Sequence, residues 1–199
     1  MLNFMNEVLA MKGKRMLTIP IITAVLALVG GLAISAQDKY TQKVPNGLAF
    51  SEFRGYEAWQ VVSISQDGNH VAAILANPVM IRAYRAGIPA NGKPFPDGSK
   101  IAKIEWRPRK ITDAPFSAST PDTVPGRLTE VEFIEKNAKR FSDTNGWGYA
   151  VFDYDAASDT FAPGTLAGKP PQGNDAKCGA ACHKLAAATD YIFTAYPKR

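Results

Sequence analysis

The stretch KCGAACHK, residues 177–184, holds both cysteines of the chain and one of its two histidines. Two cysteines followed directly by a histidine are the arrangement that attaches haem c, because the thiols bond to the porphyrin and the imidazole binds the iron. The usual spacing has two residues between the cysteines, whereas three separate Cys178 from Cys182. On a helix, side chains at i and i+4 point about 40° apart, and those at i and i+3 about 60° apart. Either spacing presents both sulfurs to one edge of a haem.

Two other uses of the thiols have to be weighed. In an oxidising compartment the cysteines could form a disulfide, but a bridge within one helical turn closes a very short loop and adds little stability. A structural zinc ion is held by four ligands, more than two cysteines and one histidine provide. We therefore predict a covalently attached haem c, bound through Cys178 and Cys182, with His183 as the iron ligand.

Few groups are available for the second axial position of the iron. Sixteen residues follow His183 and none is methionine. After residue 36 the sole methionine is Met80, in an apolar helical turn where core packing is expected. His70 lies where a turn meets a strand and is expected at the surface. An iron with one protein ligand and one open face binds and transforms small molecules, so the sequence favours a reactive haem.

The N-terminus has the pattern of an export signal. A basic stretch, residues 11–15, whose Met11 is a candidate for the true start, precedes an uncharged run, residues 16–36, that ends in small residues. Residues 1–36 are therefore expected to be a signal peptide. An uncleaved membrane anchor remains open, because about 20 apolar residues span a bilayer. Both alternatives predict export of the remaining chain to the periplasm.

Length and charge limit the partners. The chain has 199 residues and a formal net charge of +5, which suits a single domain with one hydrophobic core once an export segment is removed. The basic residues form no stripe and no nucleic-acid-binding motif is present, so nucleic acid is not expected as a partner. The positive charge instead favours solubility and attraction to an acidic partner.

Short strands outnumber helices in the pattern that follows residue 36. Residues 37–55 are expected to form an N-terminal arm and residues 56–199 the domain. Alternating and β-branched residues bounded by turn formers predict strands at residues 59–64, 70–76, 100–106, 128–135, 147–154 and 191–196, with loops at 107–125 and 156–175. Because no strand–helix–strand rhythm appears, we predict an α+β fold with a mostly antiparallel sheet.

Two helices are predicted. The first, residues 78–86, follows the second strand: Asn77 can cap its first N–H groups, Pro78 suits its first turn, and Gly87 can take the left-handed conformation at its end. The second, residues 176–189, is rich in small residues and carries the haem-binding motif.

Alternation along residues 100–106 places Ile101, Lys103 and Glu105 on one face of the strand. A lysine or glutamate at such positions is ordinarily a solvated residue. Pattern alone assigns neither side chain a role.

Three blocks of sequence resemble the cytochrome P-460 family, which includes the β-sheet type of cytochrome c′. They are CGAACHKLAAATDYIFTAYP at residues 178–197, FPDGSKIAK at residues 95–103, and AKRF followed by GWGY at residues 138–149. Together they extend the resemblance from about residue 56 to residue 197. The resemblance implies a homodimer of mostly antiparallel β structure with a five-coordinate haem c.

The resemblance also implies a role for one lysine. In hydroxylamine-oxidising members of the family a lysine is bonded to a porphyrin meso carbon, and the motif position indicates Lys103, with Lys100 as the alternative. An amine pressed against an apolar macrocycle is expected to have its pKa lowered by desolvation, which leaves the free amine as the nucleophile.

The function implied is oxidation of hydroxylamine to nitrous oxide or nitrite, with electrons passed to a periplasmic acceptor such as another cytochrome c. Glu105, on the face of Lys103, is a candidate proton acceptor. The aromatic wall of the substrate pocket is expected among Phe95, Trp106, Trp147 and Tyr149. Two alternatives remain: a nitric oxide-binding protein of the c′-β kind without turnover, and an electron-transfer cytochrome with His70 or Met80 as sixth ligand.

Overall fold

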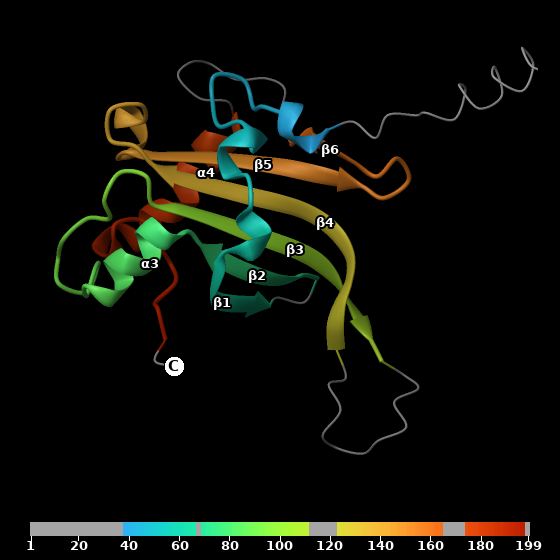
Figure 1. Ribbon diagram of the computed structural model, residues 1–199, viewed down its shortest axis with the longest axis horizontal. Coiled ribbons are helices and arrows are strands. Elements are labelled where there is room, and N and C mark those ends of the chain that lie inside the picture. The colour runs from blue at the N-terminus through green and yellow to red at the C-terminus, as the bar shows by residue number, and fades with distance from the viewer. Residues whose placement is uncertain (1–37, 67–68, 112–122, 165–173, 198–199) are drawn as a thin grey trace, which may run out of the picture. The chain divides into compact units, whose positions relative to one another are not determined.

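The computed structural model describes residues 38–66, 69–111, 123–164 and 174–197. Its centre is a six-stranded antiparallel sheet in which the strands lie in sequence order (Figure 1). The strands are β1 (Gln60–Gln66), β2 (Val71–Ala76), β3 (Lys100–Lys110), β4 (Thr123–Lys136), β5 (Trp147–Asp155) and β6 (Thr160–Pro163). With only a few short helices beside this sheet, the predicted α+β class is confirmed.

The helices are short. The α-helices are α3 (Pro78–Arg85) and α4 (Asn174–His183), and the 3₁₀ turns are η1 (Lys39–Thr41), η2 (Phe50–Phe53), η3 (Tyr56–Ala58), η4 (Ser142–Thr144) and η5 (Lys184–Thr189). Among the described helices, none has the length and apolar character that crossing a membrane requires. The predicted signal peptide or anchor, residues 1–36, lies outside the described residues.

The helix after the second strand forms for the predicted reasons. The Asn77 side-chain oxygen accepts from the backbone N of Met80 at 3.0 Å and from that of Lys100 at 3.1 Å. Pro78 occupies the first turn, and Gly87, at a φ of 86°, follows the helix end. One asparagine therefore caps α3 and joins it to the start of β3.

The central strands are longer than predicted. A loop was expected at residues 107–125, but β3 continues to Lys110 and β4 begins at Thr123, with Pro108 paired opposite Pro125. The register of the β3–β4 pair shifts on either side of Trp106, which allows the prolines to lie within the strands. Proline has no N–H group to donate within a sheet, so its presence predicted a loop here instead of paired strands. The second predicted loop, residues 156–175, likewise contains the short edge strand β6.

The C-terminal region differs from its prediction. The helix expected at residues 176–189 is divided into α4 and η5, and residues 191–196 form no strand. Asp190 and Tyr191 both have positive φ angles, 51° and 67°, which turn the chain instead of extending it. The segment then packs on the domain, where Ile192 is buried and the Thr194 carbonyl accepts from the Tyr84 hydroxyl at 3.0 Å.

The N-terminal arm is part of the folded core. Val44, Leu48, Phe50 and Phe53 are fully buried, and the Phe53 ring stacks on Phe133 of β4 with centroids 4.1 Å apart. The arm forms one hydrophobic cluster with the sheet residues Ala102 and Phe133, among others.

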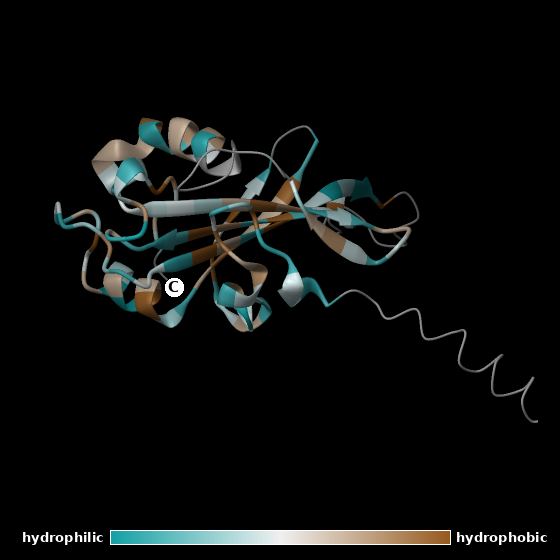
Figure 2. Cartoon of the chain, turned by 90° about the horizontal axis from the view of Figure 1, so that it is seen from above, coloured by the Kyte–Doolittle hydropathy of each residue, from teal (hydrophilic) through white to brown (hydrophobic). Residues whose placement is uncertain are grey.

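A second hydrophobic cluster contains Ile101, residues of α3, and Ile192. Ile101 and Ala102 thus lie in different clusters, as the predicted alternation requires. Figure 2 shows the strands between helices on both sides, with hydrophobic colour along the strands.

Candidate functional site

A cavity of about 790 Å³ lies between the C-terminal region and the sheet. Its volume falls within the range of small-molecule and cofactor sites. Cys182 and His183 line one side, while Lys103 of β3 and Glu132 of β4 line the sheet side. The rest of the lining is mainly apolar and includes Val62, Ile64, Ile74, Ile101, Ile134, Ile192 and Phe193.

Two of the cavity residues leave large apolar side chains open to solvent. Ile64 is 63% exposed and Phe193 is 59% exposed. Exposed apolar surface that gathers at a cavity indicates a ligand that covers it. A flat apolar macrocycle has the size and polarity that suit this surface.

The two thiols lie on one helix, as predicted. Cys178 and Cys182 are four residues apart on α4, both exposed, and neither forms a disulfide. Gly179 lies where a Cβ would come within 2.7 Å of the Tyr149 ring. A glycine between the thiols therefore lets α4 lie directly against β5.

His183, the last residue of α4, has one ring nitrogen engaged. Its Nδ1 lies 2.6 Å from the carbonyl oxygen of Tyr191. Because a carbonyl only accepts, Nδ1 carries the proton and donates, which leaves the lone pair on Nε2. The ring lies between Tyr149 and Phe193, with centroids 5.1 Å and 5.0 Å away. A fixed ring with a free Nε2 lone pair beside a cavity is suited to bind a metal.

Lys103 lies on the sheet side of the cavity. Its Nζ is 2.8 Å from Glu132 Oε1 and 2.5 Å from Glu105 Oε2. Burial alone would lower the pKa of Lys103, but the charges and hydrogen bonds of Glu132 and Glu105 outweigh it and raise that pKa above its usual value. The expectation of a lowered pKa concerned an amine pressed against a macrocycle, and it stays a prediction. Beside Glu132 and Glu105 the pKa of the amine is raised instead.

Lys100, the alternative lysine, is elsewhere. Its Nζ donates to the Glu52 carbonyl at 2.8 Å, pairs with Glu135 at 3.4 Å, and lies 4.8 Å from the centre of the Phe53 ring. Of the two lysines in the motif, Lys103 alone lines the cavity.

Glu105 is buried instead of solvated, with 6% of its surface exposed. Its carboxylate contacts Lys103 and lies 3.4 Å from Nδ1 of His70. It is not among the cavity residues. Glu105 therefore contacts the cavity lysine without lining the cavity itself, and the solvated alternative is wrong.

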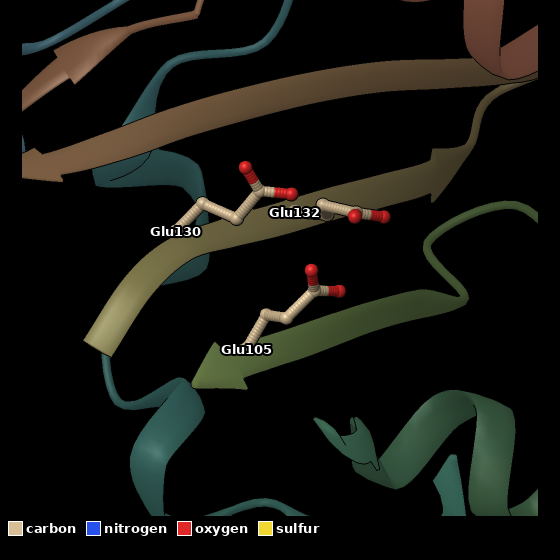
Figure 3. A group of neighbouring side chains, drawn as sticks. All are labelled: Glu105, Glu130 and Glu132. Carbon is tan, nitrogen blue, oxygen red and sulfur yellow. The ribbon is translucent and has the colours of Figure 1, made fainter. Parts of the chain in front are cut away.

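Glu132 was missed by the sequence reasoning. It pairs in register with Lys103, as Glu130 does with Glu105, and carboxylate oxygens of the three glutamates lie within 4.8 Å of one another. Figure 3 shows Glu105 reaching from β3 toward Glu130 and Glu132 of β4. The alternation of Glu130, Val131 and Glu132 on a predicted strand indicated that the two glutamates share a face. Predicting that they meet Lys103 and Glu105 also required the register of the strand pair.

Glu130 has the most altered titration of this group. Burial, together with hydrogen bonding to Glu132 and the charges of Glu132, Glu105 and Asp153, raises the pKa of Glu130 to about 7. A carboxyl that exchanges its proton near neutral pH therefore lies next to the cavity residue Glu132.

The aromatic residues predicted for the pocket wall are not there. None of Phe95, Trp106, Trp147 and Tyr149 belongs to the cavity lining, and the aromatic residue that does is Phe193. Phe95, Trp147 and Tyr149 are buried in a hydrophobic cluster, as large aromatic residues on strands commonly are. Met80 is fully buried, which confirms its expected core role.

Comparison with known proteins adds one match. The model of the family described as Cytochrome P460 matches residues 53–194. That range covers well over half of the chain and includes Lys103, Cys178, Cys182 and His183. No curated protein matches the sequence.

Proposed function

The chain belongs to the cytochrome P460 family, and on that basis we propose that it is a periplasmic haem c oxidoreductase that oxidises hydroxylamine. The family implies a haem cofactor. The observation that best supports the rest is His183, whose Nδ1–H is bound to the Tyr191 carbonyl while its ring borders a cavity opposite Lys103. Haem would supply the redox chemistry, since its iron accepts electrons and binds the substrate nitrogen.

Cys178 and Cys182 would attach the haem to α4. Each S–H adds across a vinyl double bond, so that a C–S bond forms and the hydrogen moves to the other vinyl carbon. Two free, exposed thiols one helical turn apart, with the second at the cavity, suit this reaction. His183 would then bind the iron through Nε2.

Lys103 would bond to a porphyrin meso carbon. The ammonium first has to lose a proton, and the carboxylates of Glu132 and Glu105 are close enough to accept it. Replacing the C–H bond by a C–N bond releases two protons and two electrons, so an external oxidant such as a peroxide is required.

Glu132 would accept protons from the substrate. Oxidation of hydroxylamine breaks N–H and O–H bonds, and a carboxylate at the cavity speeds proton transfer. Glu132 lines the cavity, whereas Glu105 contacts Lys103 but does not line the cavity. The role proposed from sequence for Glu105 therefore suits Glu132 better, with Glu105 and Glu130 as neighbours to which a proton can pass.

We infer the protein's partners and location from the proposed reaction, the family resemblance and the N-terminal sequence pattern. The electrons would pass to a periplasmic acceptor such as another cytochrome c, and the protein would act as a homodimer. Either a cleaved signal peptide or a retained N-terminal anchor would bring it to the periplasm.

One observation favours the alternative, nitric oxide binding without turnover. Lys103 is held by two carboxylates, and its raised pKa keeps the amine protonated, which opposes bond formation with the haem. A protein without the lysine bond would resemble the gas-binding members of the family.

The mass of the haem-bearing peptide separates the two functions. Tryptic digestion of the denatured protein should yield haem joined to the peptide of Cys178 and Cys182 and also to that of Lys103. Lys103→Ala should lose the second link, while Lys100→Ala, which changes the other lysine of the motif, should keep it. Haem on the cysteine peptide alone would favour gas binding, and a digest without covalent haem would contradict both functions.

A further inference from the structure

The turn after η5 has an unusual backbone. Asp190 and Tyr191 have φ angles of 51° and 67°. A bulky residue adopts this left-handed region only where its surroundings fix it. The backbone N of Tyr191 donates to the Ala186 carbonyl at 2.8 Å, and the Tyr191 carbonyl is thereby directed at His183. The hydrogen bond on His183 Nδ1 thus depends on this turn.

The Asp190 carboxylate holds the turn against two other parts of the fold. Its Oδ2 accepts from the backbone N of Phe95 at 2.8 Å. Its Oδ1 accepts from Lys136 Nζ, at the end of β4, at 2.9 Å. The side chains of Asp190 and Lys136 are only 12% and 8% exposed.

Lys136 is itself fixed at several points. Its Nζ donates to the Asn145 carbonyl at 3.2 Å and lies 4.9 Å from the centre of the Trp147 ring. Its aliphatic stem lies 3.4 Å from where a Cβ on Gly146 would be. The ammonium therefore has little freedom to leave Asp190.

A buried ion pair of this kind is a poor source of stability, because removing both charges from water costs as much as their attraction returns. Its value lies in fixing one geometry where others would compete. Here the geometry it fixes is the turn that supplies the acceptor for His183.

We propose that Asp190 and Lys136 are positioning residues for the iron ligand. Their ion pair sets the hydrogen bond from His183 Nδ1 to Tyr191, and a stronger bond makes Nε2 a stronger electron donor to the iron. This inference rests on the proposed function, in which His183 binds the haem iron. The ion pair thereby strengthens the iron–histidine bond and lowers the reduction potential.

The test compares substitutions in the haem-containing protein. Asp190→Asn and Lys136→Met should each shift the iron–histidine stretching band of the ferrous protein to lower frequency in resonance Raman spectra. They should also shift the midpoint potential upward in a spectroelectrochemical titration. Both readouts report on the ligand itself and not on turnover.

A matched control lies next to Lys136, where β3 begins and β4 ends. Lys100 and Glu135 form an ion pair with side chains 19% and 11% exposed, but it contacts Glu52 of the N-terminal arm and not the turn after η5. Lys100→Met and Glu135→Gln should lower thermal stability while leaving the band and the potential at their wild-type values.

The double variant Asp190→Asn/Lys136→Met separates positioning from the cost of an unpaired buried charge. It should recover part of the stability lost in the single variants but keep their shifted band and potential. Single or double variants that lose stability with an unchanged band would overturn the inference. If Asp190→Asn does not fold, Lys136→Met and the double variant decide the question alone. A wild-type protein without an iron–histidine band, or a band that survives His183→Ala, would instead contradict the proposed function and remove the premise.

Discussion

The two sides of the cavity are built from different chemistry. On the helix side, His183 is held by a main-chain carbonyl and by the rings of Tyr149 and Phe193. On the sheet side, Lys103 and Glu132 face the cavity as an ion pair, supported by Glu105. The helix side offers a ligand in one fixed tautomer, whereas the sheet side can gain and lose protons. Substitutions should therefore alter iron coordination on the helix side, and rate and pH dependence on the sheet side.

The largest effect is expected for His183→Ala. Under the proposed function, removing Nε2 removes the protein ligand of the iron. The ferrous iron–histidine band should then vanish and hydroxylamine oxidation should fall to background, while the haem stays bound to Cys178 and Cys182. Resonance Raman spectra and steady-state assays measure both effects. His70→Ala changes the other histidine and should leave the band in place. Loss of the band in His70→Ala would show that the assignment of His183 as the ligand is wrong.

Lys103→Ala should come next. It should abolish hydroxylamine oxidation while the haem remains attached and five-coordinate, because the bond proposed for the lysine is to the macrocycle and not to the iron. Turnover is measured with an artificial electron acceptor, and coordination by absorption spectroscopy. Lys100→Ala serves as control and should retain activity. Full activity in Lys103→Ala would refute the role proposed for this lysine.

Glu132→Gln should have a smaller effect. Loss of the carboxylate that is proposed to take protons from bound substrate should lower kcat about 100-fold, as is typical for a general base, with an unchanged haem spectrum. Glu105→Gln should cost less, because Glu105 does not line the cavity. Equal losses in the two variants would contradict the difference in role between these two glutamates.

The smallest effect concerns stability. The pKa of Glu130 is raised to about 7 in the folded protein, from its ordinary value of 4.5. The folded state thus binds the proton more tightly, so this group's contribution to stability is largest at low pH and is lost as the pH rises from about 4.5 to 7. Glu130→Gln should raise the free energy of unfolding at pH 8 by about 1 kcal/mol, after discounting for partial solvent exposure.

Urea unfolding at two pH values measures this difference. At pH 5 the wild-type carboxyl is already neutral, so the substitution should have little effect there, which provides an internal control. A stability gain of the same size at both pH values would show that charge is not its cause.

The sequence predicted the helix side better than the sheet side. The thiols and His183 lie within six consecutive residues of one helix, so local spacing defines their arrangement. The helix α3 was also predicted from local sequence, because Asn77, Pro78 and Gly87 specify its two ends. That the chain belongs to the predicted family is confirmed by the match over residues 53–194.

The missed features depend on contacts between distant segments. Glu132 meets Lys103 only through the register of β3 and β4, which neither strand specifies alone. The raised pKa of Lys103 has the same origin. The prediction of a strand at residues 191–196 was wrong because Asp190 is held in a left-handed turn by Phe95 and Lys136. No local sequence pattern indicates these contacts.

The order of the strands has a consequence for assembly of the protein. Each strand pairs with its neighbour in the sequence, and such short-range contacts favour rapid folding. The helix with the thiols comes after all six strands. The sheet should therefore form before the cofactor is inserted, with docking of α4 as a late step. Hydrogen exchange on haem-free protein should then find protected amides in β2 to β5. An unprotected sheet would contradict the proposal that the sheet forms before the cofactor is inserted.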